Sequence, residues 1–261
     1  MTHRLSTLIF AGLGIAAFSC SDSSGPTGGT RVGLMVSTAA SGIVGAAAES
    51  VVVGGHTLTI DKVELVLREI ELKRVAGSAD CSFDPAAAAS SDGDHHGDRR
   101  HNDECSELEI GPLLLDLPLG GGPERALSVE IDSGTYRKIE FKIHKAGSDS
   151  GDRAFLAEHP EFAGISVRVQ GTYDGEAFSW EDKVTAKQEA ALDPPLVVAE
   201  NTTTDLTLVV EVGSWFLAGG VGIIDPKLAM NNGPYEATVR NNIRRSFRIF
   251  EDRDRDGRKD H

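Results

Sequence analysis

Residues 136–144 read YRKIEFKIH. Their apolar side chains recur at every second position, at Ile139, Phe141 and Ile143, and charged side chains fill the positions between them. Successive side chains of a strand point to opposite faces, so this alternation is typical of a strand with one face in the core and one in water. The stretch predicts a half-buried β-strand.

Working outward, similar short apolar stretches recur along the chain. Strands are predicted at 32–36, 56–60, 63–73, 113–117, 127–131, 165–173, 177–181, 196–199 and 206–212. Asp174-Gly175 suits the positive φ of a tight hairpin. In 63–73 the apolar positions change face near Arg68–Glu69, which favours a strand with a β-bulge, although the same residues also fit a helix. Many short strands and few helical patterns predict a mainly β protein, an antiparallel β-sandwich over 31–217.

The segment 218–250 is predicted to connect this body to an amphipathic C-terminal α-helix over 234–250. Pro234 suits a first helical position, and Tyr235, Val239 and Ile243 begin an apolar stripe that continues to Phe247 and Phe250. Arginines lie off the stripe, so a membrane surface is an alternative to the β body as its contact. We expect packing against the β body.

The chain of 261 residues has 26 Lys+Arg against 40 Asp+Glu, a net charge of −14. Its apolar fraction of 40% is that of a globular protein. An acidic chain repels phosphates, so nucleic acid is not an expected partner.

Residues 1–19 have the pattern of a bacterial secretory signal peptide: Arg4 precedes a short apolar run from Leu8 to Phe18. The following Cys20 is predicted to carry lipid, and residues 20–30 are rich in Ser and Gly, as a flexible tether needs. We therefore expect anchoring in the cell envelope, on the outer membrane or facing the periplasm. An ordinary cleaved signal with an incidental cysteine is the alternative.

With Cys20 lipidated, Cys81 and Cys105 remain as an even pair, which predicts a disulfide in an oxidising compartment. The insert at about 77–106 between them has few apolar residues and is expected to be a solvated loop. Its His95, His96 and His101 are a weak candidate site for zinc or copper.

The C-terminal residues 251–261 form an Asp-rich tail. Asp252, Asp254, Asp256 and Asp260 fall at the first, third, fifth and ninth places of a calcium loop, with Gly257 at the sixth and no Glu at the twelfth. Ca²⁺ binding is a candidate function of these residues, and a frayed charged tail is the alternative. Interleaved Arg253, Arg255, Arg258 and Lys259 are expected to weaken the local negative field.

Short motifs stand at Ser133–Arg137, Ser214–Phe216, Ile224–Pro226 and Asn242–Phe247, followed by the Asp-rich tail. Through these residues the chain resembles a family of bacterial cell-envelope lipoproteins classed as a domain of unknown function. The resemblance covers about residues 31–260. It implies a transthyretin- or immunoglobulin-like sandwich and no catalytic residues.

We therefore expect a lipid-anchored, non-catalytic binding or structural module with an unknown envelope ligand or protein partner. A metal-sequestering or metal-responsive lipoprotein, using the tail and the His/Asp-rich insert, is the alternative. A periplasmic hydrolase is the third hypothesis, because Ser148–Asp152 faintly resembles a nucleophile loop but is better explained as a turn. Trp180 and Trp215 could stack on sugars, although core packing is the commoner role.

Overall fold

The computed structural model describes residues 29–39, 48–74, 110–120 and 122–259. Its strands are β1 (Arg31–Thr38), β2 (Glu49–Val53), β3 (His56–Arg74), β4 (Leu113–Asp116), β5 (Glu124–Glu130), β6 (Gly134–Ile143), β7 (Val167–Tyr173), β8 (Glu176–Asp182), β9 (Ala186–Val198), β10 (Thr203–Val210), β11 (Leu217–Ala218), β12 (Gly222–Ile223) and β13 (Phe247–Glu251). Its α-helices are α1 (Asp152–Glu158) and α2 (Glu236–Arg245), and 3₁₀ turns cover Pro160–Phe162, Val212–Ser214 and Pro226–Ala229. The chain is mainly β, as its sequence predicts.

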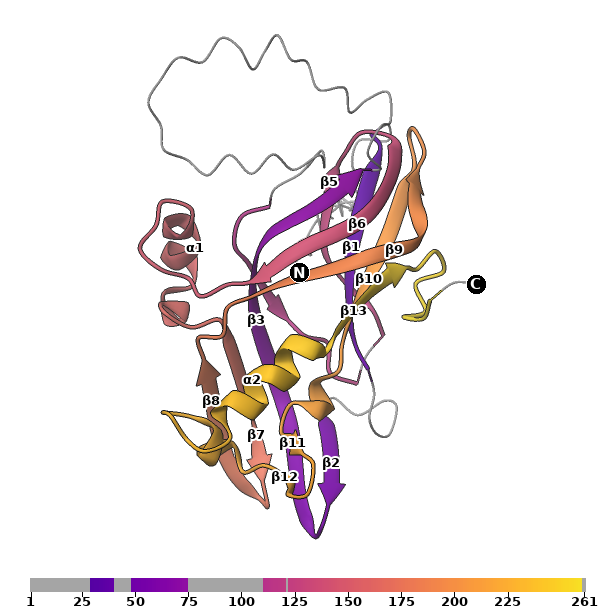
Figure 1. Ribbon diagram of the computed structural model, residues 1–261. Coiled ribbons are helices and arrows are strands. Elements are labelled where there is room, and N and C mark those ends of the chain that lie inside the picture. The colour runs from indigo at the N-terminus through magenta and orange to yellow at the C-terminus, as the bar shows by residue number, and fades with distance from the viewer. Residues whose placement is uncertain (1–28, 40–47, 75–109, 121, 260–261) are drawn as a thin grey trace, which may run out of the picture.

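Strand β3 organises the larger, seven-stranded sheet. It has 19 residues, a length of about 60 Å at strand rise, and Figure 1 shows it running along the body. One side of β3 pairs first with β2 and then with β4, and the other side pairs first with β7 and then with β6. Strand β8 lies outside β7 and strand β9 lies outside β6.

The smaller sheet has the order β13-β10-β1-β5. Its β1 and β10 are parallel, with Arg31 opposite Thr203, so the expectation of a wholly antiparallel body is wrong at this pair. Parallel neighbours need a long connection rather than a hairpin, and here most of the chain lies between the two strands. Alternating side chains indicate which face of a strand is buried but not the direction of its neighbour.

A single buried cluster unites the two sheets and the C-terminal segment. It contains Leu34 of β1, Leu65 of β3, Leu206 of β10 and Val239 and Ile243 of α2. Removing such side chains from water is the main favourable term in folding, at about 1.5–3 kcal/mol for each large apolar residue. The segment after residue 217 is therefore part of the same core.

Several local predictions are confirmed. Asp174 and Gly175 have positive φ, 49° and 85°, in the turn between β7 and β8. Stretch 63–73 lies within β3, where the pairing with β6 shifts between Arg68 and Glu71 and Glu69 has a φ of 52°. The bulge is therefore where the change of face predicts it.

The helix expected over 234–250 is wrong after Arg245. Helix α2 ends at Arg245, and Phe247–Glu251 form β13, which pairs with β10 at the sheet edge. Phe247 packs edge-on against Phe141 of β6, with ring centroids 5.6 Å apart. Apolar residues at 247 and 249 also fit the alternation of a strand. Pairing with the edge of β10 favours a strand over a helix for these residues.

Both tryptophans belong to the core, so sugar stacking is not their role. Trp180 and Trp215 are fully buried. Their indole N–H groups donate to the Ala229 carbonyl oxygen and to Ser246 Oγ, each at 2.9 Å.

Candidate functional sites

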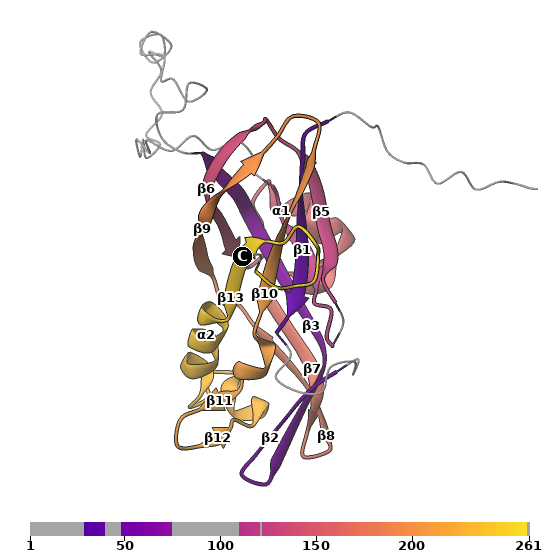
Figure 2. The ribbon, with the colours of Figure 1, turned by 90° about the vertical axis from the view of Figure 1, so that its right-hand side faces the viewer.

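The C-terminal loop 252–257 folds back over the four-stranded sheet. The Asp252 N–H donates to the Asp205 carbonyl oxygen at 3.1 Å. A Cβ at Gly257 would lie 3.1 Å from Pro123 and 3.5 Å from Ser37 of β1, which places this glycine against the sheet. Figure 2 shows the yellow loop crossing in front of β1 and β10. A frayed tail is therefore the wrong description of these residues.

The Asp252 carboxylate is the anchor of this loop, and it is fully buried. It accepts hydrogen bonds from Thr207 Oγ1 at 2.6 Å, from the Asp256 N–H at 3.1 Å and from the Gly257 N–H at 3.0 Å. Thr207 lies on the face of β10 opposite the core residues Leu206 and Leu208, because side chains alternate along a strand. The sequence therefore buries a carboxylate outside the apolar core by giving it three donors.

Carboxylate oxygens of Asp252, Asp254 and Asp256 lie within 4.8 Å of one another, so the structure brings together three of the four predicted calcium ligands. Asp260 lies outside the described residues. Ca²⁺ takes six to eight oxygens, so three carboxylates could supply only part of a coordination shell.

Arg253 and Arg255 form ion pairs with carboxylates other than these three aspartates. Arg253 Nε lies 2.8 Å from Glu251, and Arg255 Nε lies 2.6 Å from Asp205 Oδ2. Within the described part of the chain, no ion pair reaches Asp252, Asp254 or Asp256. Their negative charge is met by neutral N–H and O–H donors instead.

A second cluster lies where the connection between β6 and β7 leaves the seven-stranded sheet. Here Val66 of β3 donates to the Ser166 carbonyl oxygen and accepts from the His144 N–H, both at 2.9 Å. Residues 144–166, which include α1, therefore begin and end beside the same residue of β3.

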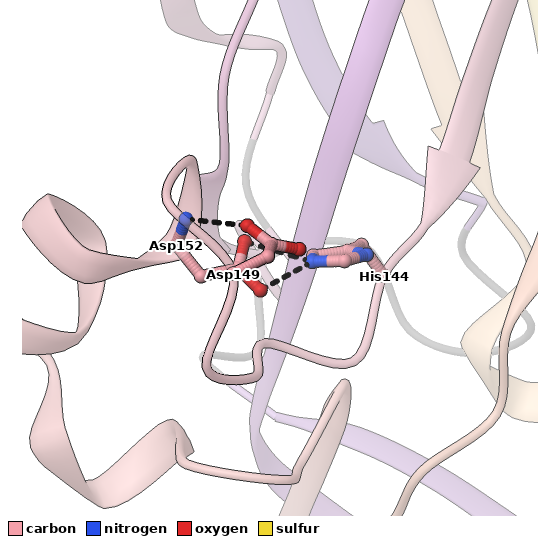
Figure 3. Close-up of side chains that lie close together, drawn as sticks. All are labelled: His144, Asp149 and Asp152. Carbon is pink, nitrogen blue, oxygen red and sulfur yellow. Dashed lines mark hydrogen bonds and ion pairs between the residues drawn. The ribbon is translucent and has the colours of Figure 1, made fainter. Parts of the chain in front are cut away.

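Asp152, the first residue of α1, is the centre of this cluster and is fully buried. Figure 3 shows its carboxylate facing the imidazole of His144, with both carboxylate oxygens 2.9 Å from Nε2. The Gly147 N–H donates to Oδ2 at 2.6 Å, and Arg68 Nη1 donates to Oδ1 at 3.3 Å. An ionised carboxylate only accepts, so Nε2 carries the proton in this pair.

Asp149 closes the cluster from its exposed side. Its Oδ1 accepts the Asp152 N–H at 3.0 Å, and its Oδ2 lies 2.9 Å from Arg68 Nη1. The hydrogen bond from Arg68 lowers the pKa of Asp149, and the same bond raises the pKa of the guanidinium. His144, Asp149 and Asp152 also place ligand atoms within 4.8 Å of one another, but Arg68 already supplies a cation there.

Sequence reasoning missed the cluster at His144. The loop 148–151 is a turn, as expected, but Asp152 begins a helix and has a histidine beside it. Its guanidinium comes from Arg68, far away in sequence, and no spacing motif links the two. The only signal is His144 directly after the alternating strand of residues 136–143.

The remaining predicted site residues, Cys20, Cys81, Cys105, His95, His96 and His101, lie outside the described residues, as does the whole insert at 77–106. Among the helices that the structure describes, none is long and apolar enough to cross a membrane. Comparisons with protein-family models, with curated proteins and with solved structures found no match to this chain.

Proposed function

We propose that this chain is a lipid-anchored protein of the bacterial cell envelope whose β body is a non-catalytic binding or structural module. Support for the anchor comes from residues 1–30: a basic start, a short apolar run, Cys20 and a tether rich in Ser and Gly. Strand β1 begins at Arg31, one residue after the expected tether. The tether would therefore lead straight into the folded body.

The observation that carries the binding role is that chain entry and the hairpin tips lie at opposite ends of the body. Arg31 pairs with Glu130 and Thr203 at one end. The turns of the β2–β3, β7–β8 and β11–β12 hairpins lie at the other end, as Figures 1 and 2 both show. A lipid on Cys20 would hold one end at the membrane and present these turns to a partner.

The far end carries exposed apolar side chains. Val52 and Val53 of β2 are 67% and 41% exposed, and Val221 of the β11–β12 turn is 51% exposed. Nearby, His56 stacks on Tyr173 with ring centroids 5.6 Å apart. Val197, 65% exposed, lies instead on β9 opposite Thr135, but clustered apolar exposure such as that of the three valines is typical of contact surfaces.

In this proposal the two sheets pack face to face as a β-sandwich with a helix in the C-terminal segment. The shared buried cluster and the contact between Phe141 and Phe247 support that arrangement. A disulfide between Cys81 and Cys105 would close the insert, as two thiols in an oxidising compartment do.

Calcium binding by the loop 252–257 is a second proposed function, in line with the metal-responsive alternative. It is favoured by the three converging aspartates and by the arginines that pair elsewhere. Extracellular calcium sites have dissociation constants of about 10⁻⁴–10⁻³ M, so the bound fraction would follow the calcium level outside the cell.

The hydrolase hypothesis stays third. Asp152 and His144 resemble the orienting pair of an acyl-transfer site, which also needs a nucleophile within hydrogen-bond reach of the histidine. In the described residues, no hydrogen bond joins His144 to a serine, threonine or cysteine side chain. The pair instead holds α1 against β3.

The anchor is tested by metabolic labelling of the expressed full chain with palmitate. We expect label on the wild-type protein and none on the Cys20→Ser variant. The double variant Cys81→Ser/Cys105→Ser is the matched control and should retain the label, because those thiols are not in a lipidation motif. Equal labelling of Cys20→Ser and wild type would overturn the anchor.

A further inference from the structure

A polar surface cavity of about 460 Å³ lies away from both acidic clusters, between the end of β8 and the first turns of α2. Figure 1 shows the start of α2 beside β8. Asp182, Lys183, Asn231, Asn232, Glu236 and Arg240 supply its polar lining, and Ile165 and Met230 add apolar surface. Its volume is in the range of about 300–1,000 Å³ that holds small molecules.

One wall of the cavity is fixed by a chain of hydrogen bonds. Arg240 Nε donates to both oxygens of Asp182 at 2.9 and 3.0 Å, and Nη2 lies 2.5 Å from Glu236 Oε1. Glu236 Oε2 in turn accepts the Asn232 N–H at 2.6 Å. Asp182 and Glu236 are buried, so these groups are held in place before any ligand arrives.

The facing loop is a tight turn that exposes two amides. Asn231 and Asn232 have φ values of 54° and 63°, and the Gly233 N–H donates to the Met230 carbonyl oxygen at 2.9 Å. Glycine would accept both positions with less strain, whereas asparagine tolerates positive φ and keeps a side-chain amide there. Residues in this conformation gather at ligand-binding sites.

The cavity offers both hydrogen-bond donors and hydrogen-bond acceptors. Among the described residues, the side chains of Lys183, Asn231 and Asn232 have no hydrogen-bond or ion-pair partner. Each amide both donates and accepts, and the ammonium donates. With Glu181, which also lines it, the cavity has three carboxylates against the two cations Lys183 and Arg240, a net charge of only −1.

We infer that this cavity binds a neutral saccharide. Hydroxyl groups donate and accept at once, as the exposed amides do, and the apolar surface of Ile165 and Met230 suits the C–H face of a sugar ring. This saccharide site rests on the proposed function of the β body as a binding module. It does not depend on the lipid anchor at Cys20.

The test is calorimetric titration of the full chain, purified in detergent, with maltose, cellobiose and diacetylchitobiose. Glucuronate and glucosamine serve as the anionic and cationic probes. We expect at least one neutral disaccharide to bind, and to bind more tightly than either charged sugar. No binding by the neutral sugars, or a preference for a charged one, would overturn the saccharide site.

Asn231→Gly/Asn232→Gly is the decisive variant, because glycine keeps the positive φ and removes only the amides. We expect it to weaken binding about tenfold or more, the loss of hydrogen bonds from both amides. Asn201→Gly is its matched control, since Asn201 also has a positive φ, 57°, but lies outside the cavity. Lys183→Ala, an exposed change that leaves the turn intact, should weaken binding as well. Unchanged affinity in both cavity variants would contradict the assignment.

The palmitate experiment reports on the anchor separately. A chain that is labelled at Cys20 but binds no sugar loses only the cavity assignment. A chain that binds sugar but carries no label loses only the anchor.

Discussion

The cluster at His144 and the loop at Asp252 each bring three ligand atoms within 4.8 Å of one another, and each is built on a fully buried aspartate. They differ in how the negative charge is balanced. Arg68 lies 3.3 Å from Asp152 and His144 faces it, whereas Asp252 is held by a hydroxyl and two N–H groups. The first cluster contains its own cation, whereas no ion pair between described residues reaches the three aspartates of the second.

The largest expected effect concerns the cluster that contains its own cation. Asp152→Ala would leave Arg68, His144 and the Gly147 N–H without their shared acceptor, and breaking such a buried pair costs about 3–5 kcal/mol. Urea unfolding should show this loss in the free energy of unfolding. Asp149→Ala, at the exposed side of the same cluster, is the control and should lose clearly less. Equal losses would mean that burial of Asp152 does not matter.

A third carboxylate, Glu140 of β6, extends the comparison to lysine partners. Burial raises the pKa of Glu140, but hydrogen bonds from Lys138 and Lys187 outweigh it and lower the pKa from 4.5 to about 2. A lowered pKa stabilises the fold above the unfolded value and loses that contribution as pH falls. Unfolding free energy should therefore drop between about pH 4.5 and 2, by at most about 3 kcal/mol.

Glu140→Gln provides the control, because it has no carboxylate to protonate. Its unfolding free energy should fall less steeply over the same pH interval than that of the wild type. Parallel pH curves for the two proteins would remove Glu140 from the acid response.

A smaller effect is expected at the hydroxyl that holds Asp252. Thr207→Val keeps the shape of the side chain and removes the donor to a buried carboxylate, a hydrogen bond worth about 1.5–3 kcal/mol. Thr203→Val, an exposed change on the same strand, should alter the free energy of unfolding by less than about 0.5 kcal/mol. If the two variants unfold at the same urea concentration, the Asp252 carboxylate does not depend on this donor.

The mainly β fold could be predicted because a strand with one buried face has apolar residues at every second position. Residues 136–144 show this alternation. Strand β9 was predicted only at its end, since Ala186–Leu192 is polar at its exposed positions and Pro194-Pro195 resembles a break. Helix α1 was missed because seven residues contain too few turns to show a period. Phe247 and Phe250 fitted a helical stripe, and only the neighbouring β10 favours a strand there.

The candidate sites also combine contacts between residues that are close in sequence with contacts between residues that are far apart. The spacing of Asp252, Asp254 and Asp256 is local, so the sequence predicts their convergence. The partner of Arg255 is not local, because Asp205 of β10 comes near the loop only once β13 has paired with β10. The cluster at His144 combines local contacts within residues 144–152 with long-range contacts to Arg68.

Calcium titration of the wild-type chain, followed by urea unfolding with and without the ion, separates the two acidic clusters. With a dissociation constant of about 10⁻⁴–10⁻³ M, about 10 mM Ca²⁺ should raise the free energy of unfolding by about 1.4–2.7 kcal/mol. Asp254→Asn should abolish this gain, and Asp149→Asn should leave it intact. A wild-type chain that unfolds identically with calcium and with chelator would contradict the calcium loop, and loss of the gain in Asp149→Asn would place the ion at His144 instead.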